Sequence, residues 1–391
     1  MIHAFFFLVI ALFPIYIFGS GGLQISHGVL AAAIVFNLGT LYKSYRMLDR
    51  RKRSVLKNVL YLVVVIVAVQ IAYAAILNDA RVLLFAAFAI LNLVYLYSIV
   101  LYLNIGGVRA VNTLFFAVFA AVSISFGGLL AGVSSSEYRR TSFFNNPNQL
   151  GYFALLASTT LGVLAQFAKV RFTKAFFASG ILMCSYLALV SLSKAAMISI
   201  ALCVFFWGTM FAMHEILIAS LVILVGGLFV GRQLAETDSV KKGVVRLGSV
   251  GRDADDTLLM RGYGRLIERP EYLVFGAGEG GFHRFKTQGE IHSTFGTVIF
   301  SYGILGTLFF CRFLIGCLRV NPSGFIVVFL PVMVYGLTHH GLRFSYFWLL
   351  AGLFLVVGPG LKIRGGRRDT QSRNSHRHLA SRTHAVAPGL Y

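Results

Sequence analysis

Basic, amide and histidine side chains gather in four short stretches, and these residue types can bind a phosphorylated sugar and move a proton. The stretches are "EYRRTSFFNNPNQLGYF" at 137–153, "SLSKAAM" at 191–197, a glycine-rich segment at 261–306 and "THHGLRFSYFW" at 338–348. A guanidinium group matches phosphate oxygens in a bidentate fork, and a histidine can accept a proton near neutral pH. The four stretches are therefore the candidate site.

The first stretch has two interpretations. Pro147 suits the first turn of a helix, and the asparagines before it suit a cap, so a capped helix start explains part of the pattern. Polar side chains at the head of a helix can also line a cavity for sugar or phosphate groups, and we favour this because the cap leaves most of them without a task. The candidates here are Arg139, Arg140, Asn145, Asn148 and Gln149.

In the second stretch, Ser193 and Lys194 interrupt two apolar runs. Lys194 is the only lysine or arginine between Lys174 and Arg232. A lysine at a helix end can extend its ammonium group to the membrane surface, so a structural role and a binding role both stay open.

The third stretch offers several basic groups. Arg261 and Arg265 are four residues apart and share a face if helical. The run "GAGEGG" at 276–281, which contains Gly278, predicts either a turn with N–H groups near a phosphate or a plain surface turn; no βαβ unit surrounds it. His292 opens the next apolar run, where an isolated histidine is more often structural than catalytic, although neighbouring arginines favour catalysis.

The fourth stretch contains His339, His340 and Arg343. Adjacent histidines point in different directions on a helix, so they do not form a metal clamp. We expect His339 and Arg343 to line a substrate site.

The composition places these stretches in a membrane protein. Of 391 residues, 57% are hydrophobic and 13% charged, and the mean hydropathy is +0.77. Many apolar runs approach the roughly 20 residues that a helix needs to cross the hydrocarbon core, and they lack the period-2 alternation of a membrane β-barrel. We predict an all-α, polytopic fold of about twelve transmembrane helices, with starts near residues 4, 25, 59, 82, 108, 148, 175, 195, 216, 292, 325 and 344.

The basic connections set the orientation. They lie at 46–57, at 169–174 and in the tail from 362, and alternation along twelve helices puts all three on one side. The positive-inside rule makes that side the cytoplasm, so both termini are expected there and all four polar stretches outside. The net charge of +21 therefore indicates orientation, and no nucleic-acid partner is expected. We predict one transmembrane domain over 1–361 with a long outer loop at 232–290, and a disordered basic tail at 362–391.

Several chemistries are disfavoured. The four cysteines lie in apolar runs without a Cys/His cluster, so neither disulfides nor zinc are indicated. Acidic residues fall in loops, at membrane ends and in the tail, which predicts no buried carboxylate and argues against a secondary transporter. There is no Asp-rich pair for a divalent ion, so we expect no metal and no cofactor.

In this order, the four stretches resemble the O-antigen ligase and O-antigen polymerase superfamily of bacterial envelope glycosyltransferases. The similarity extends over about 130–310 and more weakly to 338–348, while the first hundred residues match only in hydropathy. It implies a type C glycosyltransferase architecture with a periplasmic site beneath the long loop. Family members transfer a glycan from undecaprenyl pyrophosphate to a sugar hydroxyl without metal.

Carried over by motif, the resemblance makes Arg140, Lys194 and Arg261 pyrophosphate ligands, with Arg139 and Arg265 beside them, and His292 the candidate base. Arg261 counts as catalytic as well. The expected substrate-binding residues are Asn145, Asn148, Gln149, Ser193, Gly278, Ser293, His339 and Arg343. Two positions depart from the family pattern, which often has Arg where Lys194 stands and Asn where Ser293 stands. Lysine is a point charge where arginine is a bidentate clamp.

The chemistry is consistent with these residues. Pyrophosphate is a good leaving group, so the reaction needs positive charge at the departing oxygens rather than the paired carboxylates of a glycosidase. The expected function is a polymerase that joins lipid-linked repeats into O-antigen or exopolysaccharide in the bacterial inner membrane. A ligase that uses a lipid A core acceptor shares the donor, and a polysaccharide flippase is the alternative from another class. Membrane lipid is an expected partner, and a chain-length regulator is left open.

Overall fold

The computed structural model describes residues 1–18, 24–133, 140–211, 261–285 and 289–361, and within these ranges every regular element is a helix. Residues Met1–Leu361 form one compact unit. The predicted helix near 216, most of the long loop and the predicted tail lie outside the described residues, as does Arg139.

The long elements are α1 (Ile2–Ala11), α2 (Ile25–Met47), α3 (Arg50–Leu77), α4 (Leu83–Leu130), α5 (Pro147–Phe167), α6 (Thr173–Ser191), α7 (Lys194–Phe211), α13 (Thr294–Val320), α14 (Pro322–Gly336) and α15 (Ser345–Val357). Short turns are η1 (Ala80–Val82), α11 (Gly264–Glu268), α12 (Glu271–Phe275), η5 (Phe282–Arg284) and η6 (Gly358–Gly360). In the described part of the chain, seven helices are long and apolar enough to cross a membrane. The prediction of an all-helical, multi-pass membrane protein is confirmed at this level.

Two predicted boundaries differ from the structure. The predicted helices near 82 and 108 form the single element α4, which bends at Gly107, where φ is 50° and ψ is −133°. The helix predicted from 59 begins at Arg50, because the Asp49 carboxylate accepts a hydrogen bond from the N–H of Lys52 at 2.8 Å and caps it. The basic stretch after Asp49 is thus helical rather than a loop.

Side-chain caps start the helices that carry the candidate site. Asn146 accepts a hydrogen bond from the N–H of Asn148 at 2.7 Å, and Pro147 follows it as the first residue of α5. Ser293 caps α13 in the same way through the N–H of Gly296 at 3.2 Å. These caps satisfy N–H groups that a helix start leaves without partners.

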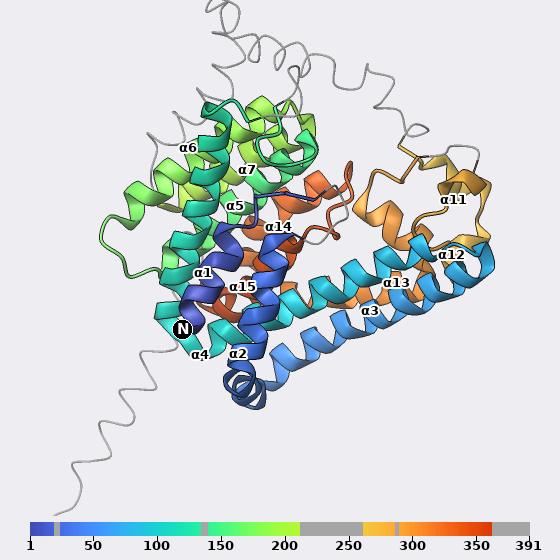
Figure 1. The fold of residues 1–391 in the computed structure, drawn as a ribbon, viewed down its shortest axis with the longest axis horizontal. Coiled ribbons are helices and arrows are strands. Elements are labelled where there is room, and N and C mark those ends of the chain that lie inside the picture. The colour runs from blue at the N-terminus through green and yellow to red at the C-terminus, as the bar shows by residue number, and fades with distance from the viewer. Residues whose placement is uncertain (19–23, 134–139, 212–260, 286–288, 362–391) are drawn as a thin grey trace, which may run out of the picture. The chain divides into compact units, whose positions relative to one another are not determined.

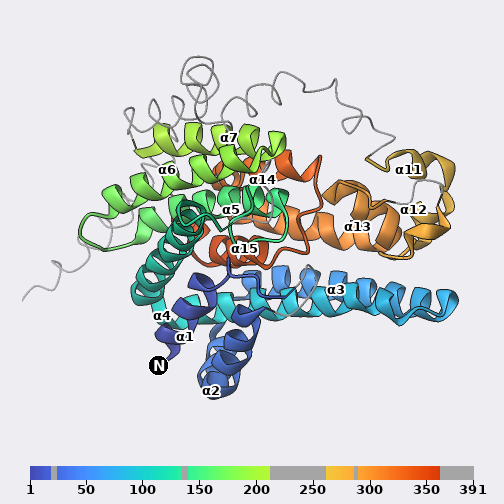
Figure 2. The same ribbon diagram turned by 45° about the horizontal axis from the view of Figure 1, so that its top comes forward.

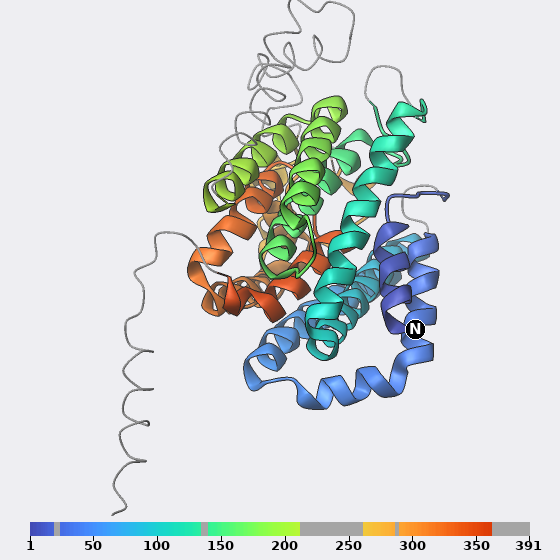
Figure 3. The ribbon, with the colours of Figure 1, turned by 90° about the vertical axis from the view of Figure 1, so that its left-hand side faces the viewer.

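The helices pack in two connected groups. The first half of α4 runs beside α3, and α13 lies along α3 (Figures 1 and 2). Beyond its bend, α4 turns toward α5 and α6, which pack on each other and on α7 (Figure 3). The helix α15 packs against both α4 and α5, and α14 against α7 and α13. The end of α14 and the residue before α15 lie against the start of α5, where the Tyr152 ring contacts Tyr335 and Phe344.

The glycine-rich run 276–281 docks on α13 where that helix breaks. The break is at Gly303, whose φ is 62°. The carbonyls of Phe300 and Ser301, in the turn before it, accept hydrogen bonds from the N–H groups of Ala277 and Gly278, both at 2.8 Å. A break of this kind leaves carbonyls of the preceding turn available to other donors.

Glycine is required at this crossing because the two backbones touch. Gly276 has a φ of 82°, and a Cβ there would lie 2.6 Å from the carbonyl oxygen of Ser301 and 2.9 Å from backbone atoms of Tyr302. On the other side, the Tyr73 hydroxyl of α3 donates to the Gly276 carbonyl at 3.0 Å. The run is held between α3 and α13.

The contact at Gly276 predicts a stability difference between two glycine substitutions. We expect Gly276→Ala to destabilise the protein by about 1–3 kcal/mol, because it forces a left-handed backbone and a clash with α13. Gly289→Ala is the matched control, since a Cβ at Gly289 meets nothing within 4 Å. Thermal unfolding of the purified proteins in detergent measures both, and equal midpoints for the two variants would contradict the packing described here.

Candidate functional site

The docked run carries a carboxylate into the protein interior. Glu279 is 2% exposed, and its backbone N–H donates to the Gln70 side chain of α3 at 3.2 Å. The flanking glycines make this possible. Gly278 and Gly280 have φ values of 67° and 85°, and a Cβ would lie 3.0 Å from the Tyr73 ring at Gly278 and 2.8 Å from the Phe85 ring at Gly280. The expectation that the protein has no buried carboxylate is wrong, because an acid in a turn-like run is here turned inward.

Glu279 has three side-chain partners. Arg343 donates through Nε to one carboxylate oxygen at 2.6 Å and forms a second contact through its terminal nitrogen. The Tyr302 hydroxyl donates to the other oxygen, and His340 Nε2 lies 3.5 Å from that same oxygen. The carboxylate is thus satisfied by groups from α13 and from the connection between α14 and α15.

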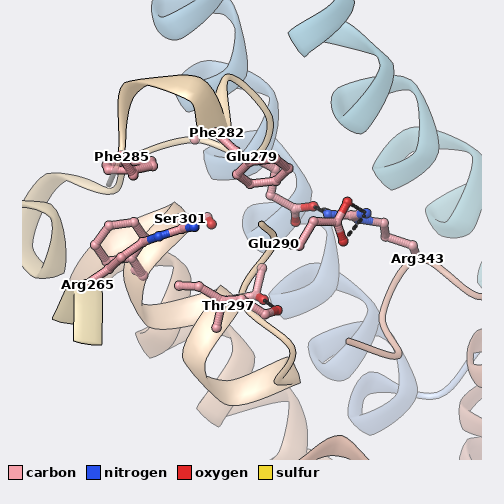
Figure 4. A pocket seen from close by; sticks show the side chains of 11 residues that line it. Arg265, Glu279, Phe282, Phe285, Glu290, Thr297, Ser301 and Arg343 are labelled. Atoms are coloured by element: carbon pink, nitrogen blue, oxygen red, sulfur yellow. Dashed lines mark hydrogen bonds and ion pairs between the residues drawn. The ribbon is translucent and has the colours of Figure 1, made fainter. Parts of the chain in front are cut away.

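Arg343 also pairs with a second carboxylate. Its Nη1 lies 3.0 and 3.1 Å from the two carboxylate oxygens of Glu290, and its guanidinium carbon lies 4.5 Å from the centre of the Phe85 ring. Figure 4 shows Glu279 and Glu290 both directed at this guanidinium. The structure therefore places the predicted substrate ligand Arg343 between two acids of its own chain.

The charges in this cluster stabilise one another. Burial by itself raises the pKa of the Glu279 carboxyl, but the neighbouring Arg343 and His340 outweigh burial and hold that pKa well below its usual range. Burial lowers the pKa of Arg343, and the two carboxylates outweigh it, so the pKa of Arg343 is raised. Both groups are therefore charged across the physiological pH range.

A small pocket opens beside the pair. The predicted residue Arg265 reaches it from α11 and faces Arg343 across it, as Figure 4 shows. Arg265 is 2% exposed, donates to the Gly289 carbonyl and lies 4.8 Å from the Phe285 ring centre. Burial and the nearby Arg284 lower the pKa of Arg265. The other lining residues are Gly278, Glu279, Phe282, Phe285, Glu290, Ile291, Thr297, Phe300 and Ser301.

Arg261 and His292 form a second cluster. The N–H of His292 donates to the Arg261 carbonyl at 3.1 Å, and the Arg261 guanidinium donates to the Thr338 carbonyl at 2.8 Å. The His292 side chain is exposed. The structure therefore brings these two predicted residues together at the start of α13.

Two further predicted residues lie beside this cluster in supporting positions. The Ser293 hydroxyl caps α13 and donates to the Gly336 carbonyl at 3.3 Å. The carbonyl of His339 accepts from both the N–H and the hydroxyl of Thr294, at 3.1 and 3.0 Å. The hydroxyl of Ser293 is thus engaged in holding α13 against α14.

The predicted polar residues before and within the start of α5 are anchored in several directions. Asn145 donates to the Phe18 carbonyl at 3.1 Å, while the Asn148 carbonyl accepts from the Tyr335 hydroxyl at 3.0 Å. The Gln149 side-chain oxygen is buried without a hydrogen-bond partner among the residues described. The Asn145 side chain is therefore directed at the chain after α1, while Asn148 contacts the end of α14 through its backbone carbonyl.

The turn between α6 and α7 lies against α5. Arg140 donates its N–H to the Val190 carbonyl at 3.2 Å. Ser193 is 2% exposed, and a Cβ at Gly151 of α5 would lie 3.2 Å from its side chain. Lys194 is the first residue of α7 and is half-buried. The first two polar stretches of the sequence are thus neighbours.

Tyr335 links the start of α5 to the start of α13. Its ring stacks on His339, with ring centres 4.7 Å apart, and on Tyr152 of α5, at 4.3 Å. Together with its hydrogen bond to Asn148, this makes the end of α14 the connection between the amide cluster and the cluster of Arg261 and His292.

Sequence reasoning missed three residues of the interior cluster, Gln70, Glu279 and Tyr302, and it named His340 without giving it a role in the site. One signal was available for Glu279, because an acid among four glycines suits a backbone that passes close to other chains. Nothing marks Gln70 or Tyr302 within their apolar helices. The residues that the structure describes contain no group of three or more His, Cys, Asp or Glu side chains arranged to hold a metal.

Comparison with known proteins does not assign the chain to a family. No family model matches the chain, and no curated protein is significantly similar to it.

The pair of Glu279 and Arg343 predicts non-additive mutational effects. Arg343→Gln leaves Glu279 buried without its main partner, so we expect a loss of about 3–5 kcal/mol in stability. The double variant Glu279→Gln/Arg343→Gln removes both charges and should lose less than Arg343→Gln alone. Chemical or thermal unfolding in detergent measures the difference, and a double variant that is less stable than the single one would refute the pairing.

The lowered pKa of Glu279 predicts the pH range over which this carboxylate stabilises the folded protein. A carboxyl whose pKa is lower in the folded state adds stability above its unfolded pKa, about 4.3, and loses it as the pH falls toward its folded pKa. The stability difference between the native protein and Glu279→Gln should therefore shrink as the pH falls below about 4. An equal difference at pH 5 and at pH 2.5 would contradict this assignment.

Proposed function

We propose that the protein is an inner-membrane polymerase that joins undecaprenyl-pyrophosphate-linked oligosaccharide repeats into O-antigen or exopolysaccharide. In this proposal the chain forms about twelve transmembrane helices of the type C glycosyltransferase kind, with both termini in the cytoplasm and the site at the periplasmic face. The donor is the lipid-linked glycan, and the acceptor is the sugar hydroxyl of a second glycan. The reaction uses no metal.

One observation carries the proposal. The residues predicted independently from distant stretches converge on the end of α14: Tyr335 binds the start of α5, and Thr338 binds Arg261, whose carbonyl holds His292. A basic group, an exposed histidine and an amide-rich helix start are what transfer from a pyrophosphate carrier requires.

The proposed reaction assigns a task to each group. The acceptor hydroxyl attacks the anomeric carbon of the donor, and His292 takes its proton. The bond from that carbon to the pyrophosphate oxygen breaks, and its electron pair leaves with the pyrophosphate. Arg261, with Arg140 and Lys194, offsets the charge that develops there. Asn145, Asn148 and Gln149 hold sugar hydroxyls or orient the arginines.

A transporter of polysaccharide or lipid-linked sugar is a second candidate, favoured by the buried pair of Glu279 and Arg343. Ionisable groups inside membrane proteins often mark transport pathways. The sequence argument against a transporter was that no carboxylate is buried in the membrane protein. Because Glu279 is buried, that argument no longer holds. The two candidates differ in product, because a transporter makes no new glycosidic bond.

Deletion of the gene followed by analysis of surface and lipid-linked glycans tests the proposal. We expect single repeats on the core and no long polymer. Long chains that remain on the carrier above a bare core would point to a ligase instead. Single repeats held inside the cell would support the transporter.

At residue level we expect Arg261→Ala and His292→Ala to abolish polymer in the deletion strain while the protein stays in the membrane, because they remove the leaving-group charge and the base. Their controls are Arg269→Ala and His283→Ala, two exposed residues of the same loop. Immunoblots of membranes and glycan gels measure both outcomes. Full polymer in either test variant would remove that residue from the mechanism.

A further inference from the structure

The short helix α12, which lies in the predicted outer loop, has an apolar outer side. Its last two residues, Val274 and Phe275, are 52% and 79% exposed. The two residues before them, Tyr272 and Leu273, pack inward on buried apolar side chains of the loop and of α13. A single exposed apolar residue is ordinary, but a contiguous apolar patch marks a surface that something apolar covers. The surroundings of Val274 and Phe275 therefore decide what covers them.

This outer side of α12 adjoins the exposed side of α13. A Cβ at Gly303 would lie 2.4 Å from the Val274 carbonyl oxygen, so the end of α12 crosses α13 at that glycine. Directly after the glycine, α13 exposes Ile304, Leu305 and Leu308. Because α13 is long and apolar enough to cross a membrane, these three side chains face lipid. Val274 extends the same apolar surface beyond the break in α13.

The position of α12 along α3 places it at the depth of the membrane. The apolar part of α3 lies between Lys57 and Asn78 and is about 30 Å long, which matches the hydrocarbon core of a bilayer. The Tyr73 hydroxyl donates to the carbonyl of Gly276, the residue after Phe275, at 3.0 Å. Tyr73 lies about 7 Å before Asn78 along the helix axis. The end of α12 therefore lies within the apolar span of α3.

The helix α3 exposes apolar side chains at the same height. Ile71 and Ile76, which flank Tyr73 in sequence, are both exposed. Polar residues begin only at Asn78 and Asp79, where α3 has ended. Figures 1 and 2 show α12 at this end of α3. Two long helices and α12 thus present apolar surface at one level.

The two ends of α12 differ in chemistry. Its first residue, Glu271, is exposed and pairs with Arg269 at 3.8 Å. Its last two residues are Val274 and Phe275. A segment with charged groups at one end and exposed apolar side chains at the other suits the boundary between water and lipid.

We propose that the outer side of α12, Val274 and Phe275, inserts into the bilayer and contacts the acyl chains of its lipids. The partner is the hydrocarbon of bulk phospholipid, and no particular headgroup is needed, because both side chains are uncharged. Gly276 follows Phe275 directly, so this contact anchors the start of the run that carries Glu279 inward. The anchor is independent of the reaction, since a polymerase and a transporter would need it equally.

Tryptophan fluorescence in brominated lipid measures this contact, because bromine on an acyl chain quenches an indole that touches the hydrocarbon. The native tryptophans, Trp207 and Trp348, are both buried, so the full-length native protein supplies the background. In nanodiscs of dibrominated phosphatidylcholine, compared with unbrominated ones, we expect Phe275→Trp to lose fluorescence as strongly as Leu308→Trp of α13.

Glu271→Trp is the matched control on the same helix. Its indole should be quenched by iodide in the buffer and not by the brominated chains, the reverse of the result for Phe275→Trp. Val274→Trp gives a second position on the outer side and should behave as Phe275→Trp does. It keeps the test decisive if Phe275→Trp does not reach the membrane.

Two results would overturn the proposal. If iodide quenches Phe275→Trp as it quenches Glu271→Trp, and brominated lipid does not, α12 lies in water. If neither quencher reaches Phe275→Trp or Val274→Trp, another part of the chain or a second copy covers this side. Nanodiscs that hold a single protein molecule separate these two covers, because only a second copy is lost by dilution.

A charge at Phe275 tests whether the contact anchors α12. In the Val274→Trp protein, Phe275→Glu should reduce quenching by brominated lipid and increase quenching by iodide, because a carboxylate is costly at hydrocarbon depth. Phe275→Leu, which keeps an apolar side chain, should leave both unchanged. Equal quenching in the two variants would show that Phe275 does not anchor the helix.

Discussion

The hydrogen bonds from the N–H groups of Ala277 and Gly278 to α13 fix the charged interior of the protein. They exist because α13 breaks at Gly303 and because Gly276 allows two backbones to touch. Once the run is docked there, Glu279 faces inward, and Arg343 and His340 meet it. A buried carboxylate is stable in that place only with these partners. The position of the connection between α14 and α15 thus depends on a glycine-rich loop far away in sequence.

The same connection serves both clusters. The end of α14 and the first part of this connection, Tyr335–His339, contact the start of α5 and the start of α13, while His340 and Arg343 reach the interior acid. A shift of this connection would change the surroundings of Arg261 and of Arg343 together. The proposed transfer site and the buried pair of Glu279 and Arg343 are therefore coupled through nine residues of chain, from Tyr335 to Arg343.

Much of the fold follows from hydropathy and caps. The apolar runs predict the helices, and Pro147 with the asparagines before it predicts where α5 begins. Ser293 was predicted as a substrate ligand, and only the structure shows that it caps α13. Two features escape such reasoning. An apolar run does not reveal where it bends, so Gly107 appears only in the structure. The direction of Glu279 is likewise invisible, because the glycines that turn it inward also suit an exposed turn, and its partners lie about 60 and 210 residues away. The sequence predicts only that the four polar stretches lie on one side of the membrane. It does not predict which of them contact one another.

The most direct measurement of the central claim is glycan synthesis by the purified full-length protein. The protein would be placed in lipid vesicles with undecaprenyl-pyrophosphate-linked single repeats, and the lipid-linked products would be separated by length. The account predicts a ladder of longer chains together with free undecaprenyl pyrophosphate. Single repeats that remain unchanged, or that only cross the bilayer, would contradict it.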